Sequence, residues 1–216
     1  ISGAGLREGI MFNQALPSTI EKPVSDVLTY SLTTLVKWYD CDEKHVEHVV
    51  NLSIQLFKQL RVLHKFPRQY LKVLKVAATL HDCGMRIKYY NHQRHSWYMI
   101  LNANLYGVTH REIVLAAFTA CCHKKEDINP LDWARFKDIL HEDDIEIVKR
   151  LGVMLRIAES LDRSMSGCIK GINCDILGDS VIMKTEVEGD ASLEIRDAMA
   201  AGAEFKKSFH KNLEIL

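Results

Sequence analysis

Few residues in this sequence interrupt regular structure, and neither sign of charge is in excess. Only four of the 216 residues are proline and eleven are glycine, so long helices are rarely broken. No apolar run approaches the roughly 20 residues that cross a bilayer, and the N-terminus has no signal-peptide pattern, so we expect no membrane association. Lysine plus arginine and aspartate plus glutamate number 28 each, and we expect no nucleic acid partner.

Cysteine is present without the spacing that a disulfide framework or a thiolate metal site needs. The six cysteines (41, 83, 121, 122, 168 and 174) form no CxxC pair. We therefore expect thiols in a reducing cytoplasm. The chain also opens at Ile1 without a methionine, which indicates a fragment of a longer protein.

Apolar residues recur at helical spacing over most of the first 166 residues. The expected helices cover about 24–39, 43–63, 69–80, 95–105, 110–122 and 144–163, with a short helix after Asn129-Pro130. Thr109 and Glu112 have the spacing of a capping box, which predicts the start of the fifth helix. Pro17 and Pro23 bracket a linker within the less regular residues 1–25.

Beyond Gly167 the pattern changes to that of a small α+β unit. Residues 169–177 and 181–187 are typical of two strands, with Gly178-Asp179 as the turn between them. The tail then predicts a third strand at 192–195, a helix at 198–209 and a last strand at 213–216. The predicted fold class is therefore mainly α, with a small C-terminal α+β annex.

The most informative feature is the pair His81-Asp82, which ends the apolar run 73–80 and precedes Gly84 as a helix stop. Burying an imidazole beside a carboxylate costs free energy unless a bound ligand offsets the lost hydration. A divalent cation or a phosphate-bearing ligand is the usual reason. A hydrogen-bonded helix end is the competing interpretation of the pair alone.

Further histidines and carboxylates recur on separate predicted helices: His45, His92, His95, His123, Glu159 and Asp162. Helices that contribute one or two ligands each build metal sites in bundle cores, and mixed imidazole and carboxylate ligands suit Mn²⁺, Fe, Zn²⁺ or Mg²⁺. Each residue also has an ordinary interpretation. His45 would be a core or surface histidine, His123 would interact with a helix dipole, and the two acids would pair with neighbouring arginines.

Seven basic side chains lie close in sequence to this set: Arg86, Lys88, Arg94, Lys124, Lys125, Arg156 and Arg163. In a chain of zero net charge, such local positive density favours a phosphorylated or polyanionic ligand. Solvated helix ends are the alternative interpretation.

The order His45, His81-Asp82, His95, His123 and then Glu159 or Asp162 resembles the HD superfamily of helical metal-dependent phosphohydrolases. Over essentially its whole length the chain is similar to the C-terminal half of an exopolyphosphatase/guanosine pentaphosphatase, the Ppx/GppA family. Three stretches carry this resemblance: residues 5–10, residues 155–164 and the tail with 186–189 and 203–209.

The resemblance implies three parts: a leader or linker from a missing actin-like catalytic half (1–25), an HD-type helical domain (26–166) and the α+β annex (167–216). It implies that the full-length enzyme hydrolyses phosphoanhydrides, either inorganic polyphosphate or pppGpp, with Mg²⁺. It also implies a homodimer in the full-length protein. The metal positions of an HD site fall on His45, His81, Asp82 and Glu159 or Asp162, with His95 and His123 as further candidates for Mn, Fe or Zn.

Three hypotheses stay open from the sequence. The first is a polyphosphate-binding module that supports the full-length enzyme through its arginines and lysines and is inactive as an isolated fragment. The second is an autonomous HD phosphohydrolase with a working metal site. The third is a structural dimerisation domain.

Overall fold

The computed structural model describes residues 26–124 and 128–216, together with residues 7, 11 and 14. Apart from those three residues, the predicted leader 1–25 and its family-like stretch 5–10 lie outside the described part, as does Lys125. The division into a leader, a helical domain and an annex stays a prediction.

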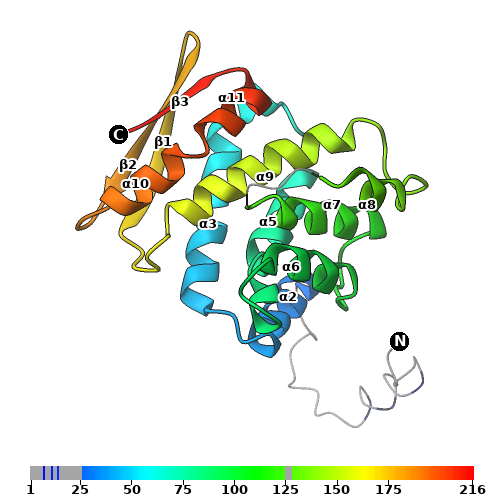
Figure 1. Cartoon of the computed structure of the whole chain (residues 1–216). Coiled ribbons are helices and arrows are strands. Elements are labelled where there is room, and N and C mark those ends of the chain that lie inside the picture. The colour runs from blue at the N-terminus through cyan, green and yellow to red at the C-terminus, as the bar shows by residue number, and fades with distance from the viewer. Residues whose placement is uncertain (1–6, 8–10, 12–13, 15–25, 125–127) are drawn as a thin grey trace.

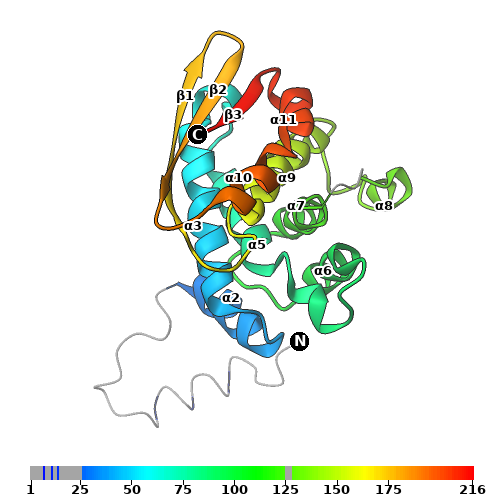
Figure 2. The same cartoon turned by 60° about the vertical axis from the view of Figure 1, so that its left-hand side comes forward.

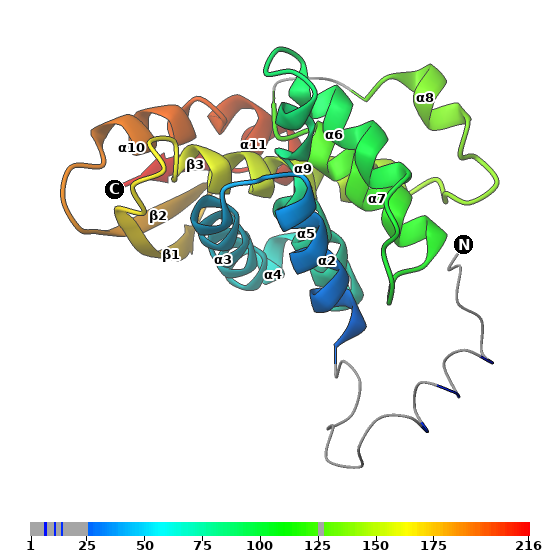
Figure 3. The same ribbon diagram turned by 90° about the horizontal axis from the view of Figure 1, so that it is seen from below.

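A bundle of helices forms the larger part of the molecule (Figure 1). Its elements are α2 (Val27–Trp38), α3 (Glu43–Gln59), α4 (Arg61–His64), α5 (Gln69–Leu80), the 3₁₀ turn η1 (Cys83–Arg86), α6 (His92–Leu101), α7 (His110–Cys121), α8 (Pro130–Ala134) and α9 (Asp144–Ser160). Helix α5 lies in the middle of the bundle and contacts α2, α3, α7 and α9. Figure 3 shows α2, α3 and α5 side by side when the bundle is seen from below.

Polar caps fix where several of these helices begin. The Asp26 carboxylate accepts hydrogen bonds from the backbone N–H groups of Leu28 and Thr29, and Asp42 caps α3 in the same way. The predicted capping box between Thr109 and Glu112 is present at the start of α7. These caps satisfy N–H groups that have no partner inside the helix.

The annex is a three-stranded sheet with two helices (Figure 2). Strands β1 (Ile169–Leu177) and β2 (Ser180–Val187) form an antiparallel hairpin, and β3 (Asn212–Ile215) adds to β2 in parallel. Gly178 in the turn has a φ of +51°, which glycine adopts without strain. Helices α10 (Ser192–Met199) and α11 (Gly202–Phe209) lie between α9 and β3, and β1 lies against α3.

The annex and the bundle share one hydrophobic core. Buried Met183 of β2 and Phe205 of α11 belong to the same cluster as Leu52 of α3 and Met154 of α9. The elements therefore pack around one shared core, in agreement with the predicted class of a mainly helical protein with a small annex.

Two predictions for the tail are wrong. Residues 192–195 form the start of α10 rather than a strand, because Ala191, Ile195 and Ala198 turn one helical face inward and Glu194 bonds the Ser164 backbone N–H. The predicted helix 198–209 is interrupted at Ala200–Ala201, which separates α10 from α11. Over residues 26–124 and 128–216, every helix is too short or too polar to cross a bilayer.

Candidate metal centre

The pair His81-Asp82 lies between α5 and η1, where the chain packs closely against the first turn of α6. Gly84 makes this approach possible. A Cβ atom there would lie 2.2 Å from the carbonyl oxygen of His92 and 2.4 Å from the Ser96 nitrogen. Gly84 does not have the positive φ of a left-handed helix stop, so the prediction that it acts as a helix stop is wrong. A glycine is required here because a side chain would not fit against α6.

Four histidines around Asp82 each use the Nδ1 atom for an anchoring hydrogen bond. Nδ1 of His81, His92 and His123 bonds the carbonyl oxygen three residues earlier, of Ala78, Tyr89 and Ala120. Nδ1 of His45 bonds Oδ2 of Asp162 at 2.7 Å. Carbonyl and carboxylate oxygens only accept hydrogen bonds, so every one of these rings carries its proton on Nδ1.

The Nε2 atoms of the four rings converge on the two oxygens of Asp82. His45 and His81 lie 3.8 and 3.3 Å from Oδ2, and His92 and His123 lie 3.1 and 3.6 Å from Oδ1. The ligand atoms form two compact groups, His45–His81–Asp82 and Asp82–His92–His123. Asp82 is the residue that the two groups share.

This arrangement leaves buried polar atoms without suitable partners. With Nδ1 protonated, the Nε2 atom of a neutral ring carries a lone pair, and it faces the lone pairs of a carboxylate. Nε2 of His81 and Oδ1 of Asp82 have no aligned hydrogen bond among the described residues. The Nε2 atoms of His92 and His123 lie 3.0 Å apart and can share only one proton. Divalent cations would satisfy all of these atoms at once.

The pKa values of Asp82, His81 and His123 are shifted by their burial and by one another. Burial alone would raise the pKa of Asp82, but the adjacent His81 ring outweighs it and holds this pKa well below its usual value. Burial and the nearby His81 ring lower the pKa of His123 well below the usual value. Burial would lower the pKa of His81, but the charge and hydrogen bonding of Asp82, together with the charge of Glu159, outweigh it and raise this pKa, so His81 takes up a second proton more readily than a free imidazole does. His123 therefore stays neutral at neutral pH, as a metal ligand must.

Asp162 contacts His45 through Nδ1, the ring nitrogen that does not face Asp82. It accepts the Nδ1–H of His45, lies 2.9 Å from Nδ1 of His48 and accepts the backbone N–H of Gly167. The His48 contact has ion-pair distance without hydrogen-bond alignment. Burial would raise the pKa of Asp162, but the two histidines outweigh it and lower this pKa. A carboxylate behind an imidazole ligand fixes the orientation of the ring in metal sites.

Glu159 pairs with two cations rather than with a histidine, and its role as a ligand stays a prediction. Its Oε1 atom accepts hydrogen bonds from Lys124 at 2.8 Å and from Arg163 at 3.0 Å, so its charge is already balanced. Glu159 is in neither ligand group, and Asp162 is the acid that contacts a histidine of the centre. His95 is also in neither group; His92, three residues earlier, provides the imidazole of α6.

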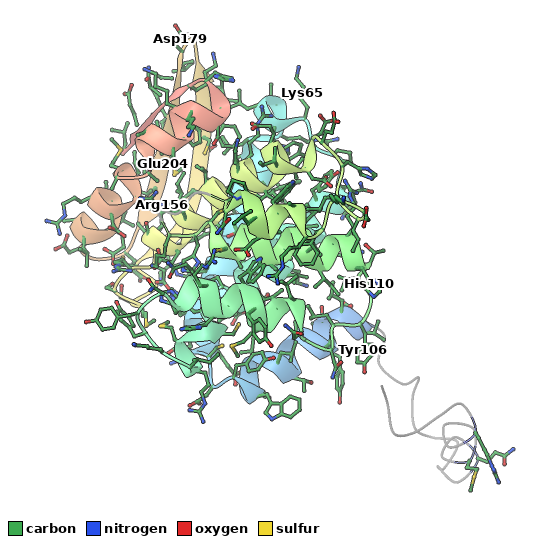
Figure 4. The ribbon with its side chains drawn as sticks, turned by 45° about the vertical axis from the view of Figure 1, so that its right-hand side comes forward. Lys65, Tyr106, His110, Arg156, Asp179 and Glu204 are labelled. Atoms are coloured by element: carbon green, nitrogen blue, oxygen red, sulfur yellow. The ribbon has the colours of Figure 1, made fainter. Side chains whose placement is uncertain are left out.

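The described members of the predicted phosphate-binding set are spread over several places, although Lys124 and Arg156 line one cavity. Arg86 is exposed and pairs with Asp40, Lys88 is exposed, and Arg94 pairs with Asp132. Lys124 and Arg163 both form ion pairs with Glu159. Arg156 pairs with Glu204 near the C-terminal helices (Figure 4).

A cavity of about 210 Å³ gives access to the centre. Its walls include His45, Asp82, Met85, Arg86 and Met165. Asp82 is one-tenth exposed, while His81 and His123 are fully covered. A ligand in this cavity can therefore reach Asp82 and the guanidinium of Arg86 without disturbing the histidines behind them.

Comparison with known sequences decides the family. The sequence model described as "Ppx/GppA phosphatase, domain III" matches residues 27–196, most of the chain. The chain belongs to the Ppx/GppA phosphatase family. This confirms the predicted resemblance and makes the chain a domain of a hydrolase family.

Curated relatives share half of the chain or slightly more. A protein of Aeromonas salmonicida named guanosine-5'-triphosphate,3'-diphosphate pyrophosphatase is 29% identical over 110 residues, which is 50% of this chain and 21% of that protein. Proteins of the same name from Pseudoalteromonas translucida and Aliivibrio fischeri are 26% identical over 129 residues and 30% identical over 109 residues. The chain thus matches only about a fifth to a quarter of the length of these relatives.

Proposed function

We propose that this Ppx/GppA-family domain is an HD-type phosphohydrolase domain whose centre holds two divalent metal ions around Asp82. The observation that carries the proposal is the convergence of four imidazole Nε2 atoms on one buried carboxylate, with each Nδ1 already tied to an acceptor. A structural histidine cluster would instead pair each Nε2 atom with a hydrogen-bond donor.

The donor set favours Mn²⁺, Fe or Zn²⁺ over Mg²⁺. Imidazole nitrogen suits the transition metals, whereas Mg²⁺ prefers oxygen ligands and retained waters. His45 and His81 would hold one ion, His92 and His123 the other, with the Asp82 carboxylate between them. Bound ions of this kind polarise a phosphoryl oxygen and lower the pKa of water.

The chain's own residues divide the remaining tasks. Asp162 keeps the His45 ring oriented, and the Tyr89 carbonyl does the same for His92. Arg86 pairs with Asp40 through exposed atoms 3.3 Å apart, a weak contact that a phosphate group can replace. The Arg86 guanidinium would then hold phosphate oxygens in the 210 Å³ cavity beside Asp82.

The test is metal analysis followed by an activity screen on phosphate esters and phosphoanhydrides. The chain loaded with Mn²⁺ should retain the metal through gel filtration and release phosphate, and His81→Ala should lose both properties. His110→Ala is the matched control, because His110 is exposed and is in neither ligand group. A loaded wild-type chain that retains no metal would refute the proposal.

The names and lengths of the relatives favour a second candidate function. Their printed name is that of a pppGpp-cleaving enzyme, and the chain matches only 21% of the Aeromonas salmonicida protein. On this account the chain is one module of a longer phosphatase, where it binds pppGpp or inorganic polyphosphate and assists hydrolysis performed elsewhere in the protein.

Titration at two ionic strengths separates the two functions. The module account expects polyphosphate binding by the metal-free chain at 50 mM salt, with affinity falling steeply by 200 mM. It also expects no phosphate release by the isolated chain. Phosphate release that depends on His81 would favour the metal-centre account, and absent polyphosphate binding at low salt would count against the module.

A further inference from the structure

A second cavity, of about 420 Å³, shares no lining residue with the cavity at Asp82 and is bounded by α9, α11 and the end of α7. Ten described residues line it: Cys122, Lys124, Ile128, Lys149, Val153, Arg156, Ala203, Glu204, Lys207 and Ser208. Figure 4 labels Arg156 and Glu204 beside one another at this place. The volume lies within the range of small-molecule sites, about 300–1,000 Å³.

Helical spacing explains why these side chains share one cavity. Lys149, Val153 and Arg156 follow one another at i, i+4 and i+7, so they project from the same face of α9. Ala203 and Lys207 have i and i+4 spacing on α11. The two helices are in contact, so their lining faces meet along one wall.

One half of the cavity lining is strongly cationic. It has four basic side chains, Lys124, Lys149, Arg156 and Lys207, and one acid, Glu204. Arg156 pairs with Glu204 at 3.4 Å, Lys124 pairs with Glu159 at 2.8 Å outside the lining, and Lys149 pairs with Glu146, which is more than half exposed. Within the described part of the chain, Lys207 makes no ion pair. Such an excess is unusual in a chain with no net charge, and it favours an anion with several charges.

The other half of the lining is apolar: Cys122, Ile128, Val153 and Ala203. Close packing fixes part of it, since a Cβ atom at Gly152 would lie 2.6 Å from the Cβ of Cys122. A bare inorganic phosphate chain would leave this wall in contact with water.

We propose that this cavity binds an organic phosphate, a molecule with two or more phosphate charges and one apolar or aromatic part. The phosphates would lie against Lys149, Arg156 and Lys207, and the apolar part would lie against Val153 and Ala203. Cation clusters recognise phosphate, and a mixed lining fixes the orientation of an amphiphilic ligand. The site is separate from the proposed metal centre and does not depend on metal.

Calorimetric titration of the whole chain in EDTA tests the proposal, with ATP and inorganic tripolyphosphate as the two probes. EDTA removes any contribution of the metal centre, so failure here is distinguishable from failure of the proposed function. We expect one ATP per chain at 50 mM salt, bound about tenfold more tightly than tripolyphosphate. Lys207→Glu should weaken ATP binding about tenfold.

Lys206→Glu is the matched control, because Lys206 is exposed on the same helix and does not line the cavity. It makes the same charge change and should alter ATP binding less than twofold. Equal effects of the two variants would overturn the proposal by showing a diffuse charge effect. Absent ATP binding, or tripolyphosphate binding as tight as ATP, would also overturn it. Thermal unfolding of both variants verifies that each remains folded.

Discussion

Replacing Gly84 with alanine should both destabilise the fold and damage the candidate metal centre. The new Cβ would lie 2.2 Å from the His92 carbonyl oxygen and 2.4 Å from the Ser96 nitrogen, so η1 and α6 must separate by about 1 Å to restore ordinary contact. Both neighbours are backbone atoms of a helix and cannot turn aside. Overpacking of this kind costs about 1–3 kcal/mol.

The same displacement carries His92 away from Asp82, where its Nε2 atom now lies 3.1 Å from Oδ1. Misplaced support of a ligand lowers metal affinity about 10–100-fold. Thermal unfolding and Mn²⁺ titration measure the two effects, and each lost kcal/mol should lower the melting temperature by about 2–4 °C.

Gly202→Ala is the control for Gly84→Ala. A Cβ atom at Gly202 would meet nothing within 4 Å, and its φ is not in the left-handed region. Alanine there should be neutral or stabilise the protein by up to about 1 kcal/mol. The reasoning is refuted if Gly84→Ala unfolds and binds Mn²⁺ as the control does.

Three further perturbations probe other parts of the account. Asp162→Asn should weaken Mn²⁺ binding about 10–100-fold by releasing the His45 ring, while Asp175→Asn on the exposed hairpin should leave titration curves unchanged. Glu112→Gln should cost up to about 1 kcal/mol at pH 7 in urea unfolding, because it removes the 2.7 Å ion pair with Lys72 and the charge at the start of α7, while the glutamine amide oxygen can still accept the capping-box hydrogen bond. Burial would raise the pKa of Glu112, but Lys72 and the Thr109 N–H outweigh it and lower this pKa. The stabilisation by ionised Glu112 is therefore full above about pH 4, and the free energies of unfolding of the two proteins should converge as pH falls through the lowered pKa. Phe205→Ala should cost about 3–5 kcal/mol and keep a single unfolding transition, whereas two separate transitions would show that the annex does not share the core of the bundle.

Local signals predicted most of the elements. The bounds of α5 and β1 agree with the expected 69–80 and 169–177, because strong apolar patterns and nearby turn residues mark both ends. The start of α6 was displaced by three residues, since the polar residues His92 to His95 have no apolar period. Residues 192–195 have a strand-like alternation, whereas the packing of Ile195 and Ala198 and the tertiary contact of Glu194 with the Ser164 backbone favour a helix.

The candidate centre was predicted in part. His45, His81, Asp82 and His123 converge as the order of histidines and acids on separate helices indicated. His92 and His95 are three residues apart, so they project in similar directions from a helix. The choice between them depends on how closely η1 approaches α6 at Gly84.

The choice between the two late acids also needed the structure. Glu159 and Asp162 share a helical stripe in the sequence, but α9 ends at Ser160. Asp162 therefore lies in the turn beyond the helix, where it reaches His45 and the Gly167 backbone. Glu159 instead pairs with Lys124, which follows the end of α7. The apolar pattern did not mark the end of α9 at Ser160, and ion pairs between distant segments are not encoded in a local pattern.

The most direct test of the metal centre is a crystal structure of the chain soaked in Mn²⁺, with anomalous scattering measured. The account predicts two peaks flanking the Asp82 carboxylate, each about 2 Å from two imidazole Nε2 atoms: His45 and His81 at one peak, His92 and His123 at the other. Density at Asp82 without an anomalous peak at either position, at a saturating Mn²⁺ concentration, would contradict it.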